Sequence, residues 1–296
     1  TAALVDVEAA RRTIAAAGVT QAEVHLSSGT SHLSLAAPVD LAVIRLPKGK
    51  LPTLQLIWDA FSSLKPGGRC YLAGANDEGI QSALRHAGDL FGSVATVTYR
   101  QGHRVGLVVK SAEPPTLPAV FRTELMDHAT FHQFAVDLRG QRYQVYSRPG
   151  VFSWEGLDEG SRALIEAMEI RAGETVLDLG CGYGIAGVVA AKLSGSGAVT
   201  LVDVALEAVE SARRTVAANS LTNCQVLLSD CAAAVRHRRF DVVVSNPPFH
   251  AGKGTTYDAA QQFIRDAAAL LRPGGRLYLV ANRFIPYERT MAQLFD

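Results

Sequence analysis

The sequence lacks the features that mark several specialised classes of protein. Its four cysteines form no Cys-x-x-Cys pair and no His/Cys cluster at zinc spacing, so we expect reduced thiols, a cytoplasmic location and no metal. No apolar run is long enough to span a membrane and no signal-peptide pattern is present, so we expect no membrane association. Neither sign of charge dominates, with 29 Lys and Arg against 28 Asp and Glu, so a nucleic acid would have to bind local basic patches.

What the chain does contain is apolar residues, 48% of 296 positions, which is enough for two domains. It also repeats itself: residues 10–16 recur as 212–218, residues 39–43 as 240–244, and residues 64–69 as 271–276. Matches in one order with a small drift in offset are typical of a duplication followed by loop insertions. We therefore predict two tandem Rossmann-like α/β domains, a first copy over residues 1–112 and a second over residues 121–296, joined by a proline-rich linker at 113–120.

The second copy alternates between strand-like and helix-like segments. Short apolar runs predict strands at 175–179, 198–202, 225–228, 241–245 and 276–281, and helical spacing predicts helices at 161–169, 185–192, 205–219 and 258–271. Right-handed crossovers between such segments produce a parallel, doubly wound sheet. We expect the functional loops to gather at the carboxyl ends of its strands.

A glycine-rich turn follows the first of these strands. Gly180, Gly182 and Gly184 stand between strand and helix, where a missing Cβ lets a ligand approach the backbone. Asp203 ends the next strand, where a carboxylate can accept hydrogen bonds from both ribose hydroxyls, and Asp230 follows the third. The ligand is either a dinucleotide or S-adenosylmethionine. The spacing GxGxG argues against a bound pyrophosphate.

The fourth strand ends in an unusual polar turn, Asn-Pro-Pro-Phe at 246–249. The Asn246 side-chain oxygen and the Pro247 carbonyl are two fixed acceptors for an amino group on a planar base, and Phe249 can stack on that base. An ordinary turn with an asparagine cap is the alternative. A methyltransferase acting on a planar amine has a use for this turn, whereas a hydride-transfer enzyme has none, so we favour S-adenosylmethionine as the ligand.

The strings at 178–184 and 246–249 resemble the class I S-adenosylmethionine-dependent amino-methyltransferases. Two longer strings, at 149–161 and 245–250, resemble in particular the bacterial ribosomal RNA guanine-N2 methyltransferases, which carry a degenerate N-terminal copy of the catalytic domain. The resemblance implies S-adenosylmethionine as cofactor and assigns a role to each matching position. The implied cofactor residues are Asp178, Gly180, Gly182, Gly184, Asp203, Asp230 and Asn246, and the implied catalytic, target-base residues are Asn246, Pro247, Pro248 and Phe249.

We therefore expect methylation of the N2 amine of a guanine in ribosomal RNA, most simply small-subunit RNA, by a monomer that acts on RNA or a ribosomal subunit. Phe249 and His250 are expected to contact the substrate. In the first copy the turn reads Arg45-Leu46-Pro47-Lys48, and its Arg45 and Lys48 are expected to bind RNA, unless that domain is only a scaffold. The first copy continues through 94–99 and 105–109, past the point that matches residue 296, so we also expect the last strand pair of the second copy to be missing from this chain.

Two other readings of the residues remain open. The same tetrapeptide would suit an amino-methyltransferase that acts on adenine N6 or on a glutamine side chain of a protein. A catalytically inactive RNA-binding assembly factor that keeps the cofactor fold is the second alternative. The intact glycine loop, Asp203 and Asn246 argue against it.

Overall fold

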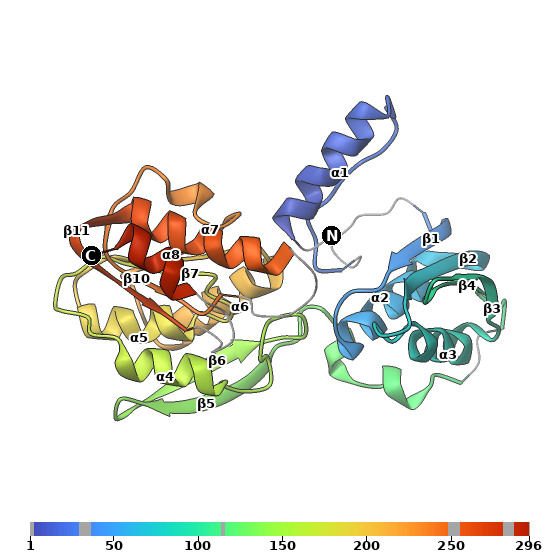
Figure 1. The fold of residues 1–296 in the computed structure, drawn as a ribbon. Coiled ribbons are helices and arrows are strands. Elements are labelled where there is room, and N and C mark those ends of the chain that lie inside the picture. Colours follow the sequence, from blue (N-terminus) through green and yellow to red (C-terminus); the bar gives the residue numbers. More distant parts are fainter. Residues whose placement is uncertain (1–2, 30–36, 114–115, 248–254, 281–286, 296) are drawn as a thin grey trace. The chain divides into compact units, whose positions relative to one another are not determined.

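The computed structural model describes residues 3–29, 37–113, 116–247, 255–280 and 287–295 (Figure 1). Contacts divide the chain into two compact units. The large unit comprises residues 1–26 and 132–296, and the small unit comprises residues 27–131. Among the described residues, no helix is both long and apolar enough to cross a membrane.

The large unit is built around a parallel sheet of five strands in the order β11-β10-β7-β8-β9. The strands are β7 (Val176–Leu179), β8 (Val199–Asp203), β9 (Cys224–Leu228), β10 (Phe240–Ser245) and β11 (Leu271–Leu279). The chain moves from β7 to β8 and β9 on one side, and returns to place β10 and β11 on the other. This reversal opens a crevice at the carboxyl ends of β7 and β10, where ligands bind in open α/β sheets.

Helices cover both faces of that sheet (Figure 1). Val176, Val242 and Val244 share one core with α4 (Glu159–Ala167), α5 (Ile185–Ser194) and α6 (Leu206–Ala218). Leu177 and Val243, one residue out of phase, share the opposite core with α7 (Thr255–Leu270). Burial on both faces explains why these strands are continuous apolar runs. The predicted α/β fold with a doubly wound parallel sheet is confirmed, and its elements lie within a few residues of their predicted bounds.

The other described elements of the large unit are a hairpin, two α-helices and a short 3-10 helix. Strands β5 (His132–Leu138) and β6 (Gln141–Ser147) form the hairpin, and Thr215 of α6 fixes it, since its Oγ1 accepts from the Tyr146 N–H at 3.1 Å and donates to the Tyr146 carbonyl at 3.2 Å. Helix α1 (Leu4–Ala16) joins this unit through a hydrogen bond from the Leu4 N–H to the Val204 carbonyl at 3.0 Å. A short 3-10 helix η3 (Ala233–Val235) and helix α8 (Tyr287–Leu294) complete it.

The small unit has a four-stranded sheet in the order β1-β2-β4-β3. Its elements are β1 (Val39–Arg45), α2 (Lys50–Ser63), β2 (Leu64–Ala75), α3 (Ile80–Phe91), β3 (Ala95–Arg100) and β4 (His103–Val109), followed by the 3-10 helices η1 (Ala119–Phe121) and η2 (Glu124–Met126). Strands β1 and β2 are parallel, and the other pairs are antiparallel.

The contact-based division of the chain differs from the boundaries that we predicted at 112 and 121. Phe121 and Met126 are buried in the core of the small unit, and the Gln55 side chain donates to the Leu125 carbonyl at 2.6 Å. These contacts keep the chain attached to the small unit as far as Phe131, well beyond the proline-rich segment. Residues 1–26 group with the large unit, not with the first copy of the repeat.

The repeat seen in the sequence has a counterpart in the strand pairing. Strand β1 pairs with β2 in a register that shifts between Val39 and Leu41. Strand β10 pairs with β11 in a register that shifts between Phe240 and Val242, the matching positions at the offset of 201 found in the sequence. A shared irregularity at matching positions supports the duplication, because unrelated strand pairs have no reason to be irregular at the same place.

Candidate functional site

The crevice between β7 and β10 is closed at its base by a hydrogen bond between the two strand ends. Ser245 is buried, and its Oγ donates to the Leu179 carbonyl at 2.7 Å. Gly180 follows Leu179 and Asn246 follows Ser245, so the predicted glycine loop and the predicted target-base turn start from neighbouring points. The fold therefore brings together two motifs that are more than sixty residues apart in the sequence.

Asp203, at the end of β8, holds the glycine loop in place. Its Oδ2 accepts from the Gly182 N–H at 2.9 Å and its Oδ1 accepts from the Ala205 N–H at 3.0 Å. Burial raises the pKa of Asp203, and backbone hydrogen bonds offset part of that increase. A carboxylate has about four acceptor positions, so Asp203 can still accept a hydrogen bond from a sugar hydroxyl.

The three glycines of the loop have different physical reasons to be glycine. A Cβ on Gly180 would lie 2.8 Å from the Phe263 ring, and a Cβ on Gly184 would lie 2.9 Å from the Ala212 Cβ. Both residues are thus needed for close packing against α7 and α6. Gly182 has a φ of +54°, and a Cβ there would meet only Val151, at 3.8 Å. Gly182 is therefore the position where a ligand can approach the loop backbone.

Asp178 lies beneath the loop and is only 3% exposed. Its Oδ2 accepts from the Gly187 N–H, in the first turn of α5, at 2.8 Å. Burial raises the pKa of Asp178 to about 7, although the Gly187 hydrogen bond acts in the opposite direction. The carboxyl group therefore supports the junction between β7 and α5 from below instead of presenting itself to a ligand.

Asp230 follows β9, and its side chain is exposed at the carboxyl end of the sheet. The next residue, Cys231, has a left-handed φ of +44°, which turns the chain sharply after the carboxylate. Burial and the nearby Asp230 raise the pKa of the Cys231 thiol to about 12, so this cysteine is not a ready nucleophile. Asp230 is thus the exposed anionic group at this edge.

Asn246 has one side-chain atom bonded and one unbonded. Its Nδ2 donates to the Ser161 Oγ, in the first turn of α4, at 2.9 Å. Its Oδ1 is buried and has no hydrogen-bond partner in the part of the chain that the structure describes. Pro247 is buried beside it, whereas Pro248, Phe249 and His250 lie outside the described residues. The structure thus gives the predicted acceptor oxygen of Asn246 a fixed position, with no donor to it among the residues described.

The loop at 156–161 contributes to the family resemblance, but its sequence alone does not indicate what it contacts. The Asp158 Oδ1 accepts from the Ser161 N–H at 3.0 Å and so caps α4. The Tyr183 hydroxyl, from the glycine loop, donates to the Gly156 carbonyl at 3.3 Å, and its ring packs edge-on against Phe134 at 5.8 Å. The loop thus forms a third wall of the crevice, beside the glycine loop and the Asn246 turn.

Arg45 and Lys48, the predicted RNA contacts of the first copy, belong to the small unit. Arg45 is the last residue of β1 and Lys48 precedes α2, and both side chains are exposed. Exposure leaves both cations available to a phosphate, as RNA binding requires.

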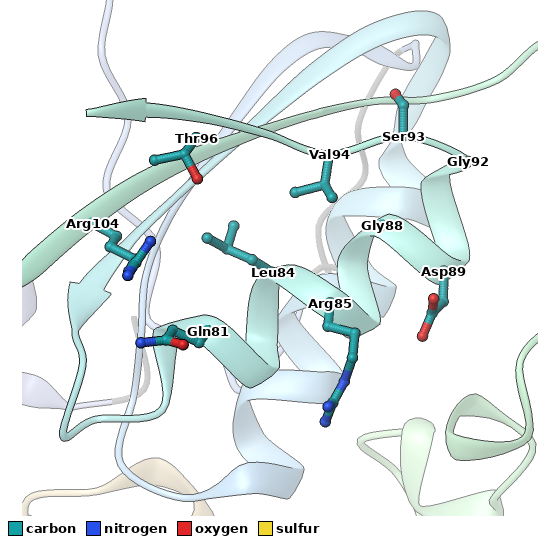
Figure 2. Close-up of a pocket in the computed structure, with 10 residues that line it drawn as sticks. All are labelled: Gln81, Leu84, Arg85, Gly88, Asp89, Gly92, Ser93, Val94, Thr96 and Arg104. Carbon is teal, nitrogen blue, oxygen red and sulfur yellow. The ribbon is translucent and has the colours of Figure 1, made fainter. Parts of the chain in front are cut away.

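The small unit also contains a cavity of about 460 Å³ between α3 and β3 (Figure 2). Figure 2 shows Leu84, Val94 and Thr96 between the helix and the strand, with Arg85 and Asp89 extending from the helix away from the strand. The second basic residue that lines the cavity, Arg104, already forms a hydrogen bond, since its Nε donates to Asn76 Oδ1 at 3.0 Å. None of the predicted cofactor or target-base residues lines this cavity, so it is separate from the crevice.

Comparison with known proteins gives matches over most of the chain. The family described as "Methyltransferase small domain" matches residues 142–296. The ribosomal RNA small subunit methyltransferase C of Escherichia coli is 35% identical over 259 residues, which cover 88% of this chain and 71% of that protein, and the Klebsiella pneumoniae protein of the same name is 34% identical.

A solved structure extends this similarity to three dimensions. The T. thermophilus 16S rRNA N2 G1207 methyltransferase (RsmC), in complex with AdoMet and guanosine, matches with a TM-score of 0.81 at 33% identity. The match covers 97% of this chain and 75% of that one.

Proposed function

The chain belongs to the ribosomal RNA small subunit methyltransferase C family, and from this premise we propose that it methylates the exocyclic N2 amine of a guanine in small-subunit ribosomal RNA. The cofactor is S-adenosylmethionine. The T. thermophilus relative was solved with AdoMet and guanosine together, which supports both the cofactor and the base. The target is the guanine that corresponds to G1207 of that relative's RNA.

One observation carries the proposal, namely the buried Oδ1 of Asn246, which has no hydrogen-bond partner in the described part of the chain. Leaving a buried acceptor without a donor costs about 1–3 kcal/mol, so a site that keeps one is built for a ligand that supplies the donor. An exocyclic amino group supplies such a donor. The hydrogen bond from Asn246 Nδ2 to Ser161 orients the carboxamide so that Oδ1 is the atom without a partner among the described residues.

The residues around the glycine loop fit S-adenosylmethionine. Gly182 leaves space in front of the loop backbone, Asp203 can accept from the ribose hydroxyls, and Asp230 offers an exposed carboxylate for the adenine end. The hydrogen bond from the Gly187 N–H to Asp178 ties the start of α5 to the end of β7 and so supports the loop between them. When bound, the cofactor supplies a methyl group attached to positively charged sulfur.

The chain's own contribution to the chemistry is orientation and electrostatics. The lone pair of a guanine N2 is delocalised into the ring, so the amine is a weak nucleophile. By accepting its hydrogens, Asn246 Oδ1 and the Pro247 carbonyl favour a pyramidal nitrogen with a localised lone pair. The same two oxygens stabilise the positive charge that develops on N2, and one proton leaves to water once the new N–C bond has formed.

Residues beyond the crevice place the RNA. We expect Phe249 to stack on the target base and His250 to contact the RNA, since both follow Asn246 and Pro247 closely in the sequence. Arg45 and Lys48 contact phosphates, which position the RNA without reading its sequence. The protein works as a monomer in the cytoplasm, where ribosomal subunits are assembled.

The test is transfer of labelled methyl from S-adenosylmethionine to ribosomal RNA from cells that lack this gene. Free RNA and both isolated subunits serve as substrates, and nuclease digestion identifies the labelled nucleoside. We expect N2-methylguanosine in small-subunit RNA. Labelled N6-methyladenosine, or label that remains with ribosomal protein, would overturn the choice of target, and binding of S-adenosylmethionine without any transfer would indicate an assembly factor.

A further inference from the structure

Two buried side-chain oxygens without a partner flank Ser161 in the large unit. One is the Asn246 Oδ1 described above, and the other is the Oδ2 of Asp158. Each is unpaired with respect to all the residues that the structure describes. An unpaired carboxylate oxygen is the more costly of the two to bury, because it carries charge.

Ser161 holds both side chains by their other polar atom. Its backbone N–H donates to Asp158 Oδ1 at 3.0 Å, and its Oγ accepts from Asn246 Nδ2 at 2.9 Å. One residue therefore fixes the orientation of both groups and leaves one free oxygen on each. The two free acceptors belong to side chains that are neighbours through Ser161, although they lie 88 positions apart in the sequence.

The loop that carries Asp158 is held tightly against the end of β11. A Cβ on Gly160 would lie 3.0 Å from Val280 Cγ1 and 3.1 Å from Asp158 Oδ1. Val280 in turn donates its N–H to the Ser245 carbonyl at 3.0 Å, next to the Asn246 turn. Asp158 is therefore positioned by the same strand end that positions Asn246.

Capping α4 explains one oxygen of Asp158 and not the other. A helix N-cap needs a single acceptor, which Oδ1 provides, and Ser, Thr or Asn would serve as well. The cap leaves Oδ2 buried and without a hydrogen-bond partner among the residues that the structure describes. A donor from outside the described chain would remove this cost, as for Asn246.

We propose that the Asp158 carboxylate accepts the N1–H of the target guanine while Asn246 and Pro247 accept the N2 hydrogens. This inference rests on the proposed function and names the group that selects the base. The pyrimidine edge of guanine presents two adjacent donors, N1–H and the N2 amine. Two acceptors whose side chains are held by the same residue, Ser161, match that pattern, and the carboxylate adds a charge-assisted hydrogen bond.

The same pair of acceptors rejects the other amines that the Asn-Pro-Pro-Phe turn can hold. Next to its exocyclic amine, adenine has the acceptor N1 and cytosine has the acceptor N3. The lone pair of that ring nitrogen would face the carboxylate and be repelled by it. A glutamine side chain has no second donor beside its amide nitrogen. Asp158 thereby makes the site selective for guanine N2 over adenine N6 and over a protein glutamine.

The variant Asp158→Asn separates this role from capping. Asparagine caps helices as well as aspartate does and keeps the shape of the side chain, but it replaces the free acceptor by an NH₂ donor. Binding of guanosine and of 2-aminopurine riboside is measured in the presence of S-adenosylhomocysteine. Both nucleosides carry the N2 amine, but N1 is a donor in guanosine and an acceptor in 2-aminopurine riboside.

We expect the unchanged protein to prefer guanosine, and the ratio of the two affinities to fall by about 10- to 100-fold in Asp158→Asn. The control Glu159→Gln removes the adjacent exposed charge and should leave the ratio unchanged. A role restricted to capping would leave the ratio unchanged in Asp158→Asn, and this result would overturn the inference.

Methyl transfer to small-subunit RNA, measured on the same preparations, distinguishes the two proposals. Transfer by the unchanged protein, together with an unaltered nucleoside ratio in Asp158→Asn, would sink the inference and leave the proposed function standing. No transfer and no guanosine binding by the unchanged protein would overturn both. Transfer with the altered ratio supports both.

Discussion

The segment from β1 to β2 in the small unit and the segment from β10 to β11 in the large unit are two versions of one strand–helix–strand motif. They share a register shift at matching positions. They also share a tight turn inside the second strand, where Gly67 has a φ of +78° and Gly274 a φ of +75°. Both motifs are thus held by the same backbone geometry.

The two motifs differ at the end of the first strand. In the large unit, Ser245 donates a hydrogen bond to β7, and Asn246 presents an acceptor that no described residue bonds. The matching positions in the small unit are Ile44, which is buried in an apolar core, and Arg45, which is exposed. The comparison teaches that the framework is retained by packing and turn geometry, whereas the chemistry depends on a few residues that can change without disturbing it.

The largest expected effect comes from removing the group that distinguishes the two motifs. Asn246→Ala should lower methyl transfer by about 100- to 1,000-fold, because it deletes a fixed acceptor for the reacting amine, and should leave cofactor binding nearly intact. Transfer to small-subunit RNA and calorimetric titration with S-adenosylmethionine measure the two quantities. Gln144→Ala, an exposed amide on β6, is the control and should transfer at the normal rate. Parallel loss of transfer and of cofactor binding would mean that Asn246 is structural.

A second prediction is that the stability of the two units depends differently on pH. The pKa of Asp178 in the folded protein is raised to about 7 by burial, whereas in the unfolded chain it is near 3.9. The Asp178 carboxyl group therefore ionises less readily in the folded state than in the unfolded chain. As a result, the free energy of unfolding of the large unit should fall by about 2–3 kcal/mol as pH rises from 5 to 8.

The two tryptophans report on the two units separately, since Trp154 lies in the large unit and Trp58 in the small one. Denaturation of single-tryptophan variants, followed by fluorescence, should show the alkaline loss at Trp154. Asp178→Asn keeps an acceptor for Gly187 and should abolish this loss. A slope that persists in Asp178→Asn would show that another group is responsible.

A third prediction tests whether the two turns are equivalent in energy. A Cβ on Gly68 would lie 2.8 Å from the Lys65 carbonyl oxygen, and a Cβ on Gly275 would lie 2.9 Å from the Arg272 carbonyl oxygen. Backbone oxygens cannot move aside cheaply, so Gly68→Ala and Gly275→Ala should each cost about 2 kcal/mol. The same single-tryptophan variants measure both. A large cost in one unit and none in the other would show that the turns only look alike.

The smallest effects concern an ion pair that occurs in both motifs. Asp241 pairs with Arg272 at 2.7 Å and also accepts from the N–H and the hydroxyl of Thr175, both at 2.8 Å, whereas Asp40 forms an exposed ion pair with Lys65. Asp241→Asn should cost about 1–2 kcal/mol and Asp40→Asn less than about 0.5 kcal/mol. Urea denaturation of the two variants checks this order, and equal costs would contradict it.

The difference between the two ion pairs should also appear in how stability changes at acidic pH. Burial raises the pKa of Asp241, but the hydrogen bonds from Thr175 and Arg272 outweigh it and lower the pKa overall. Its contribution to stability is therefore present above the pKa of the unfolded chain and is lost as pH falls through the lower, folded value. Asp241→Asn should make the large unit's stability less sensitive to pH in that acidic range.

Much of the fold could be predicted from the sequence, because its determinants are local. The apolar run 242–244 and the glycines after Leu179 indicate a doubly wound sheet, because a continuous apolar strand is typical of a sheet that is buried on both faces. The family prediction is confirmed by the match to the ribosomal RNA small subunit methyltransferases C. The predicted roles of the individual site residues stay predictions.

What escaped prediction depends on contacts between distant residues. The proline-rich segment at 113–120 indicates a boundary, but the burial of Phe121 and Met126 in the small unit depends on tertiary packing that no local pattern records. Likewise, a glycine motif does not reveal that Gly180 and Gly184 make room for Phe263 and Ala212. The free oxygen of Asp158 is visible only when Ser161 and Asn246 are seen together.

The hydrogen bonds that Asp203 accepts from Gly182 and Ala205 have a consequence for ligand affinity. They tie the loop after β7 to the end of β8 in the absence of any ligand, so the loop is ordered before a cofactor arrives. A preorganised loop loses little conformational entropy on binding, and more of the contact energy remains as affinity. Substitution of Asp203 would therefore weaken binding twice, once through the lost contact and once through the freedom returned to the loop.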